Sequence, residues 1–338
     1  KLDEIKIFLS IFFLLFFGFI IFKTHDDFAY YHFPYTYNLT QNSLLIGIGN
    51  FNHGFKTPSS LFYINSIFYI PYFKYYLFHM GAILFMGFSC SSLLISIKEQ
   101  LSKKFIDHTF FLSLMSILFI LIFFYRISEH GTDRSAQILI FLLFIQIIQI
   151  NSNYNNFLLN FTKIAVITGL IISLKAFYIL YLIIFFPIFY FIYEKKKKIM
   201  LSLKYFLINK YFVYLFLLIF FVISTYFINT GCLIYPVSVT CFQNLTWSIP
   251  ISEVNSMNNW YELWSKAGAT PNFRVDNQEI YIQKFNWVEN WISEYFFYKV
   301  SDFFAGILFT SLVFLSLFIK LNTNKKRQKN KINSLPLL

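Results

Sequence analysis

Two adjacent carboxylates, Asp26 and Asp27, stand four residues beyond the first long apolar run of the chain, which ends at Phe22. Carboxylates kept where a membrane span meets water are costly to tolerate, and such groups frequently do chemistry. Two acids side by side repel each other, so one of them binds a proton more readily, or a divalent cation lies between them. The pair therefore indicates proton transfer or cation binding at a membrane surface.

Histidines accompany this acidic pair. His25, His32 and His53 lie on the same predicted external loop, and His130 lies on a later one. Imidazoles near carboxylates can bind a metal, although the scattered spacing matches no Cys/His zinc pattern. The sequence therefore assigns no cofactor, and it leaves a divalent metal open.

Apolar runs long enough to cross a bilayer must position these residues. The chain is 57% hydrophobic and only 13% charged, and a span needs about 18 to 20 apolar residues to cross ~30 Å. We expect an all-α integral membrane protein with about eight transmembrane helices, interfacial helices and a small external helical cap. The predicted spans are Ile5–Phe22, Tyr72–Ile97, Thr109–Tyr125, Ser135–Ile150, Phe157–Leu174, Ala176–Tyr193, Tyr211–Ile228 and Phe303–Ile319.

Lys175 divides the longest apolar run, which extends from Phe157 to Tyr193. As one helix this run would stretch to roughly 55 Å, too long for a single span. The division also keeps the run Lys195–Lys198 in the cytoplasm with the other short basic loops and both termini. The net charge of +12 then faces anionic lipid headgroups, so we expect membrane lipid and not nucleic acid as its partner.

These spans divide the chain into three parts. Residues 1–228 form a transmembrane module with a first external loop at 23–72. Residues 229–302 form an external cap, and residues 303–338 contain the last span and a basic cytoplasmic tail. Within the first loop, the uncharged apolar stretch from Ser59 to Ile70 predicts a helix lying along the membrane surface.

The cap has its own signals. Cys232 and Cys241 flank a Tyr-Pro turn on the external side, and we expect a disulfide with Cα atoms about 4.4–6.8 Å apart. Two helices are expected, around Met257–Ala267 and Asn277–Tyr298. Trp287, Trp291 and Tyr295 in the second are spaced for packing, with a platform for sugar or lipid as the alternative.

The order of these elements resembles the GT-C superfamily of polytopic glycosyltransferases over residues 5–193. One span precedes a loop that opens with an acidic pair. The stretch Thr168–Phe177 looks like the family's G-L-x-x-L-T-K-G element, with Ala176 where the family usually has Gly. The loop Ser128–Arg134 stands where the family has an acidic, Arg-containing external loop.

The resemblance implies a glycosyltransferase that moves a sugar from a lipid-linked polyprenyl-phosphate donor to an envelope glycan or lipid acceptor. It implies a multi-pass protein of the bacterial inner membrane with its active face toward the periplasm. By this similarity Asp27 or Asp26 is the general base, and Lys175 and Arg134 contact the phosphate. The residues left to orient the acceptor are Glu129, Asp133 and His53.

The alternative is a non-catalytic membrane transporter or an assembly component for envelope polysaccharide. A transporter places ionisable groups in the middle of its spans. The candidate residues of this chain gather at the predicted external ends instead, which favours chemistry on an amphiphilic donor.

Overall fold

The computed structural model describes residues 2–21, 23–43, 45–102, 106–152, 157–196, 210–268, 275, 277–297, 300, 304, 307–308 and 311. These residues form helices and no strands. The chain divides into two compact units. Of the described residues, those up to 43 and those within 58–225 belong to the first unit, and those within 45–57 and 226–311 belong to the second.

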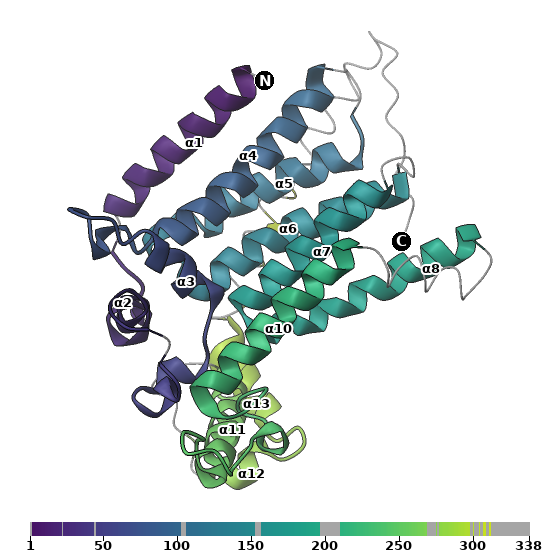
Figure 1. Cartoon of the computed structure of the whole chain (residues 1–338). Helices are drawn as coiled ribbons and strands as arrows, with labels where there is room; N and C mark the ends of the chain where they lie inside the picture. Colours follow the sequence, from purple (N-terminus) through teal and green to yellow (C-terminus); the bar gives the residue numbers. More distant parts are fainter. Residues whose placement is uncertain are drawn as a thin grey trace. The chain divides into compact units, whose positions relative to one another are not determined.

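Helices, most of them long and apolar, make up most of the first unit (Figure 1). They are α1 (Leu2–Ile21), α2 (Phe33–Gln41), α3 (Ser60–Ile67), α4 (Met80–Ser102), α5 (His108–Phe123), α6 (Gly131–Ser152), α7 (Phe157–Leu174), α8 (Phe185–Lys196) and the greater part of α10 (Lys210–Thr230). Shorter turns join them: the π-helix η1 (Phe28–His32) and the 3-10 helices η4 (Tyr75–Leu77), η5 (Ile127–Glu129) and η7 (Ala176–Ile184).

Within the described residues, four helices are long and apolar enough to cross a membrane: Leu2–Ile21, Tyr75–Ser102, Gly131–Gln149 and Phe212–Thr230. They correspond to four of the expected spans, and the membrane character follows from them. Three further apolar helices are shorter, at Thr109–Phe123, Leu159–Leu174 and Ala176–Tyr190. The eighth expected span, Phe303–Ile319, lies largely outside the described residues.

The predicted division at Lys175 is confirmed. Helix α7 ends at Leu174, Lys175 is extended (φ −148°, ψ 110°), and η7 begins at the next residue. The chain reverses direction there, as the contact between the two helices shows: the ring of Phe161 in α7 lies 6.1 Å from that of Phe185 in α8. The Ser59 hydroxyl donates to the Leu174 carbonyl at 2.7 Å, which satisfies one of the open acceptors at the helix end.

Helix α3 forms within the stretch where an interfacial helix is expected. Ser59 caps it by accepting from the Leu61 amide at 3.2 Å, the usual role of a serine before the first turn. Leu61, Phe62 and Asn65 are buried. This helix therefore packs one face inside the first unit.

Contacts at the helix ends fix which ends of the first unit lie together. At one end, Lys98 of α4 pairs with Asp3 of α1 at 2.9 Å. At the other, the Ser128 hydroxyl donates to the Phe19 carbonyl at 2.7 Å. Gly87 permits close approach between α1 and α4, because a Cβ there would lie 2.5 Å from the Phe12 ring. The helix ends that the sequence predicted on the same side of the membrane therefore lie together in the first unit.

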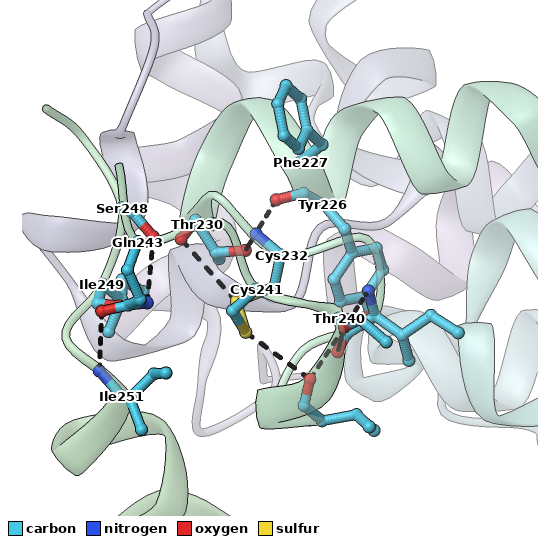
Figure 2. Close-up of a disulfide and its surroundings, with 12 residues drawn as sticks. Tyr226, Phe227, Thr230, Cys232, Thr240, Cys241, Gln243, Ser248, Ile249 and Ile251 are labelled. Atoms are coloured by element: carbon cyan, nitrogen blue, oxygen red, sulfur yellow. Dashed lines mark hydrogen bonds between the residues drawn. A yellow bond between two sulfur atoms is a disulfide. The ribbon is translucent and has the colours of Figure 1, made fainter. Parts of the chain in front are cut away.

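The second unit is held around a disulfide between Cys232 and Cys241, as predicted (Figure 2). Its Cα separation of 3.8 Å is shorter than the expected range, and the two residues also form an isolated antiparallel bridge. Gln243 ties the next turn, donating to the Ile249 carbonyl at 3.1 Å and accepting from the Ile251 amide at 3.2 Å.

The segment 45–57 belongs to this second unit, which corrects its expected assignment to the transmembrane module. The Gly47 amide donates to the Ile228 carbonyl at 2.8 Å. The side-chain amide of Asn229 donates to the Phe55 carbonyl at 2.9 Å, and the side-chain amide of Asn50 donates to the Trp247 carbonyl at 2.8 Å. These partners are distant in sequence, so composition alone could not reveal the pairing.

Short helices build the rest of the second unit: η2 (Ile48–Asn50), η3 (His53–Lys56), η8 (Ser238–Thr240), α11 (Ile251–Lys266), α12 (Gln278–Ile282), α13 (Trp287–Trp291) and the π-helix η9 (Ile292–Phe296). Helix α11 covers the first expected cap helix. The second expected helix is divided, because α12 ends at Ile282 and Lys284 takes a positive φ of 51°.

Candidate functional site

A π-helical turn after α1 presents Asp27 to the residues that follow it. The Asp27 carbonyl accepts from the amides of Tyr31 at 3.0 Å and His32 at 3.3 Å. The second bond spans five residues, so the turn is wider than an α-helical one. It places His32 one π-helical turn after Asp27. The Tyr31 hydroxyl donates to Asp27 Oδ2 at 3.3 Å. Backbone and side chain therefore both orient this carboxylate.

His25 completes the group from the other side of the turn. Its backbone amide donates to the Ser128 carbonyl at 3.2 Å, which holds it against the α5–α6 loop. Its Nδ1 accepts from the Asp27 amide at 3.0 Å and lies 3.8 Å from Asp27 Oδ2. Its ring stacks on that of His32 with centroids 5.3 Å apart. One ligand atom from each of His25, Asp27 and His32 lies within 4.8 Å of the others.

Beside this group lies a small cavity lined by four histidines. They are His25, His32, His79 and His130, with apolar residues of α3 and α4 around them. The space open to the centre of a water molecule is about 20 Å³, enough for one water or one ion. Gly131 has a φ of 41°, and its position leaves 3.4 Å between a Cβ and either His25 or His32. The loop therefore approaches both rings closely.

Two buried histidine nitrogens at this cavity have no hydrogen-bond partner among the described residues: Nε2 of His32 and Nδ1 of His130. His130 Nε2 lies 2.7 Å from the Phe124 carbonyl. A carbonyl oxygen only accepts, so Nε2 carries the proton and Nδ1 presents a lone pair. Buried polar atoms without partners are rare and call for an explanation.

Burial keeps both rings neutral. It lowers the pKa of His32 to about 3, and electrostatic repulsion between a protonated His32 and the neighbouring His25, Lys175 and His79 side chains adds to the effect. It lowers the pKa of His130 to about 4, against the raising effect of the Phe124 hydrogen bond. At neutral pH these rings are therefore acceptors or metal ligands, not cations.

Charged side chains border the same end of the first unit. Lys175 pairs with Asp133 at 3.0 Å. Arg126 and Arg134 both approach the mostly buried Glu129, at 3.5 and 3.9 Å. Three cations thus lie in one group with two carboxylates, beside the carboxylate of Asp27.

Most residues predicted for the site gather here. Asp27, Glu129, Asp133, Arg134 and Lys175 come to this end from separate parts of the sequence. Lys175 and Asp133 form a direct ion pair, so Asp133 neutralises Lys175. This differs from the acceptor-orienting role that the family resemblance implied for Asp133.

Asp26 and His53 are placed elsewhere. The Asp26 side chain is 91% exposed and pairs only loosely with Lys23, at 3.5 Å. His53 belongs to the second unit, where its Nε2 lies 3.3 Å from the Tyr261 hydroxyl. Burial, followed by the charge of Lys56, lowers the pKa of His53. The cluster around Asp27 is built without either residue.

The structure adds three residues that the sequence did not single out. Tyr31 orients Asp27, Arg126 adds a cation beside Glu129, and His79 lines the cavity. The position of Tyr31 on the π-helical turn could not be predicted from the pattern of apolar residues. Three of the four histidines at the cavity, His25, His32 and His130, were expected on external loops, whereas His79 lies within the predicted span Tyr72–Ile97.

The aromatic residues of the cap pack against their own unit. Trp287 and Trp291 meet edge to face with centroids 6.4 Å apart, and the Tyr295 ring lies against Gly268. These contacts favour packing over a platform for sugar or lipid. A flat stack does occur on α11, where Trp260 and Trp264 lie 6.0 Å apart at 16°.

Comparison with known proteins gives one match. A family model described as a domain of unknown function (DUF8201) matches residues 1–337. No curated protein matches the chain, and no solved structure matches it.

Proposed function

The chain belongs to this DUF8201 family, and we propose that it is a membrane glycosyltransferase that uses a polyprenyl-phosphate sugar as donor. One observation carries the proposal. An oriented carboxylate, that of Asp27, and three cations grouped around Glu129 and Asp133 lie at the same end of the first unit, although Asp27 and Lys175 are far apart in sequence. Transfer from a lipid phosphate needs a base and cations of this kind.

The reaction assigns each group a role. An acceptor hydroxyl oxygen attacks the anomeric carbon of the sugar, and Asp27 takes the hydroxyl proton. The bond between this carbon and the phosphate oxygen breaks, and the polyprenyl phosphate leaves with the electron pair. Lys175, Arg134 and Arg126 hold that phosphate, because these three cations lie in one group at this end of the unit. Glu129 also keeps the two guanidinium groups together.

The membrane arrangement belongs to the same proposal. We expect about eight spans, with the Asp27 end of the first unit facing the periplasm of a bacterial inner membrane. Support comes from the distribution of charges, because the four long apolar helices carry their acids and cations near their ends. The alternative of a transporter needs ionisable groups in the middle of such helices.

A pair of matched substitutions tests the base. Asp27→Asn and Asp26→Asn make the same chemical change at neighbouring residues with different surroundings. In nanodiscs supplied with radiolabelled undecaprenyl-phosphate hexoses and an envelope lipid extract, Asp27→Asn should lower transfer by about 10²–10⁴-fold. Asp26→Asn should change it by less than about threefold, because its carboxylate faces solvent.

Binding of undecaprenyl phosphate itself gives a readout that does not depend on the sugar. Lys175→Gln and Arg134→Gln should each weaken this binding about tenfold. Lys98→Gln, at the opposite end of α4, is the control and should leave it unchanged. Absence of both transfer and phosphate-dependent lipid binding would favour the non-catalytic alternative.

A further inference from the structure

We propose that His25, Asp27 and His32 form a binding site for one divalent first-row transition-metal ion. Two imidazoles and one carboxylate are a ligand set that zinc and its neighbours use. The site is a property of the folded chain and does not depend on the proposed sugar transfer.

The geometry needs little adjustment to accept an ion. The three ligand atoms lie within 4.8 Å of one another, and His25 Nδ1 is 3.8 Å from Asp27 Oδ2. Ligands at about 2.0–2.1 Å from a tetrahedral ion are separated by roughly 3.4 Å. Side-chain rotations that shorten the distances between these ligand atoms by at most about 1.4 Å close the difference.

The nitrogens are ready to act as ligands. His25 Nδ1 accepts a hydrogen bond from the Asp27 amide, so this nitrogen is unprotonated, and a bound ion would replace the amide at its lone pair. His32 is 6% exposed, and its Nε2 has no hydrogen-bond partner among the described residues. The proposal assigns this Nε2 as the His32 ligand, so that a bound ion gives the buried atom a partner. The Tyr31 hydroxyl on Asp27 Oδ2 is the kind of outer contact that orients a metal-bound carboxylate.

The surroundings select the class of ion. The adjoining cavity has room for about one ion or water. Mg²⁺ and Ca²⁺ prefer sites made of oxygen ligands, and two of the three ligands here are nitrogens. The nearby positive charge of Lys175 is offset by its partner Asp133, so the carboxylate of Asp27 retains its attraction for a cation.

Metal binding is measured directly on the full chain in nanodiscs after removal of metal with a chelator. Co²⁺ is the probe, because its visible absorption reports ligand type and coordination. We expect one Co²⁺ per chain, displaced by Zn²⁺ and not by Mg²⁺. His25→Gln and His32→Gln should each weaken binding by at least about 100-fold, since loss of an outer contact alone costs 10–100-fold.

His53→Gln is the matched control, because His53 lies in the second unit and outside the cluster. The affinity of this variant for Co²⁺ should equal that of the unaltered chain. Asp27→Asn should weaken binding, and Asp26→Asn should not. These measurements need no donor sugar. If the unaltered chain binds Co²⁺ but transfers no sugar, the enzyme proposal alone is refuted. If the unaltered chain transfers sugar but binds no Co²⁺, the metal site alone is refuted.

A measurement on the unaltered chain covers the case in which a variant fails to fold. Diethyl pyrocarbonate modifies accessible histidines, and mass spectrometry locates the product. Zn²⁺ should protect His25 and leave the rate at His53 unchanged. Equal modification of His25 with and without Zn²⁺, or Co²⁺ binding that survives both histidine substitutions, would overturn the proposal.

Discussion

Removal of the Glu253 charge should destabilise the second unit more than removal of the lysine that it pairs with. The Lys56 side chain is only 7% exposed, and its Nζ bonds to Glu253 Oε1, whose side chain is 46% exposed. Lys56 also lies 5.9 Å from the centre of the Tyr235 ring. The lysine therefore depends on Glu253 for compensation of a buried charge, whereas Glu253 keeps access to water.

The magnitude follows from this asymmetry. Breaking a fully buried ion pair costs about 3–5 kcal/mol, because one charge is left without a partner. Glutamine can still accept a hydrogen bond and water reaches this position, so Glu253→Gln should cost about 2–3 kcal/mol. Lys56→Met removes the buried charge itself and should cost less than about 1 kcal/mol. The double variant should resemble Lys56→Met.

Tryptophan fluorescence reports on this unit specifically. The chain contains 5 tryptophans, and all of them lie within residues 226–322 of the second unit. Urea titration in detergent micelles should move the midpoint for Glu253→Gln down by about 1–1.5 M, taking a slope of ~2 kcal/mol/M.

Glu262→Gln on the same helix is the control. Glu262 pairs with Lys266 at 2.6 Å in a more exposed i,i+4 contact, so the change should cost less than about 0.5 kcal/mol. A greater loss of stability in Lys56→Met than in Glu253→Gln would refute this asymmetry of the ion pair, as would a double variant whose cost is the sum of the two single costs.

Three further predictions concern the disulfide, the pH response and the topology. Replacing Cys232 and Cys241 by serine should lower the unfolding free energy of the second unit by about 2–3 kcal/mol, given their separation of 9 residues; an unchanged urea midpoint would contradict this. The pKa of His130 is about 4 in the fold against 6.5 unfolded, so its contribution to stability is present above pH 6.5 and is lost as pH falls toward 4. Thermal unfolding should show a decline of up to about 1.4 kcal/mol per pH unit, reduced in His130→Asn, and equal pH dependence in both proteins would exclude the effect. Cysteines at the exposed positions Val239 and Ser102 should react with an impermeant maleimide from opposite sides of the membrane, and labelling of both from one side would overturn the orientation.

Sequence reasoning predicted the features that depend on local pattern. Apolar length indicates helices that can span a bilayer, and a lysine in the middle of an overlong run marks its break at Lys175. The pairing of Cys232 with Cys241 followed from their closeness and shared predicted side. Charges at the ends of the predicted spans also indicated where the acid and the cations would meet.

Tertiary structure alone decided how neighbouring residues differ. Asp26 and Asp27 are the same residue type side by side, yet one faces solvent and the other accepts from Tyr31. A hydrogen bond that spans five residues brings His32 below Asp27, and apolar periodicity does not encode that register. Lys56 is buried because Glu253, far away in sequence, supplies the opposite charge. Such contacts depend on loop closure between distant segments, whose partners are set by packing of the whole unit and not by the residues beside them.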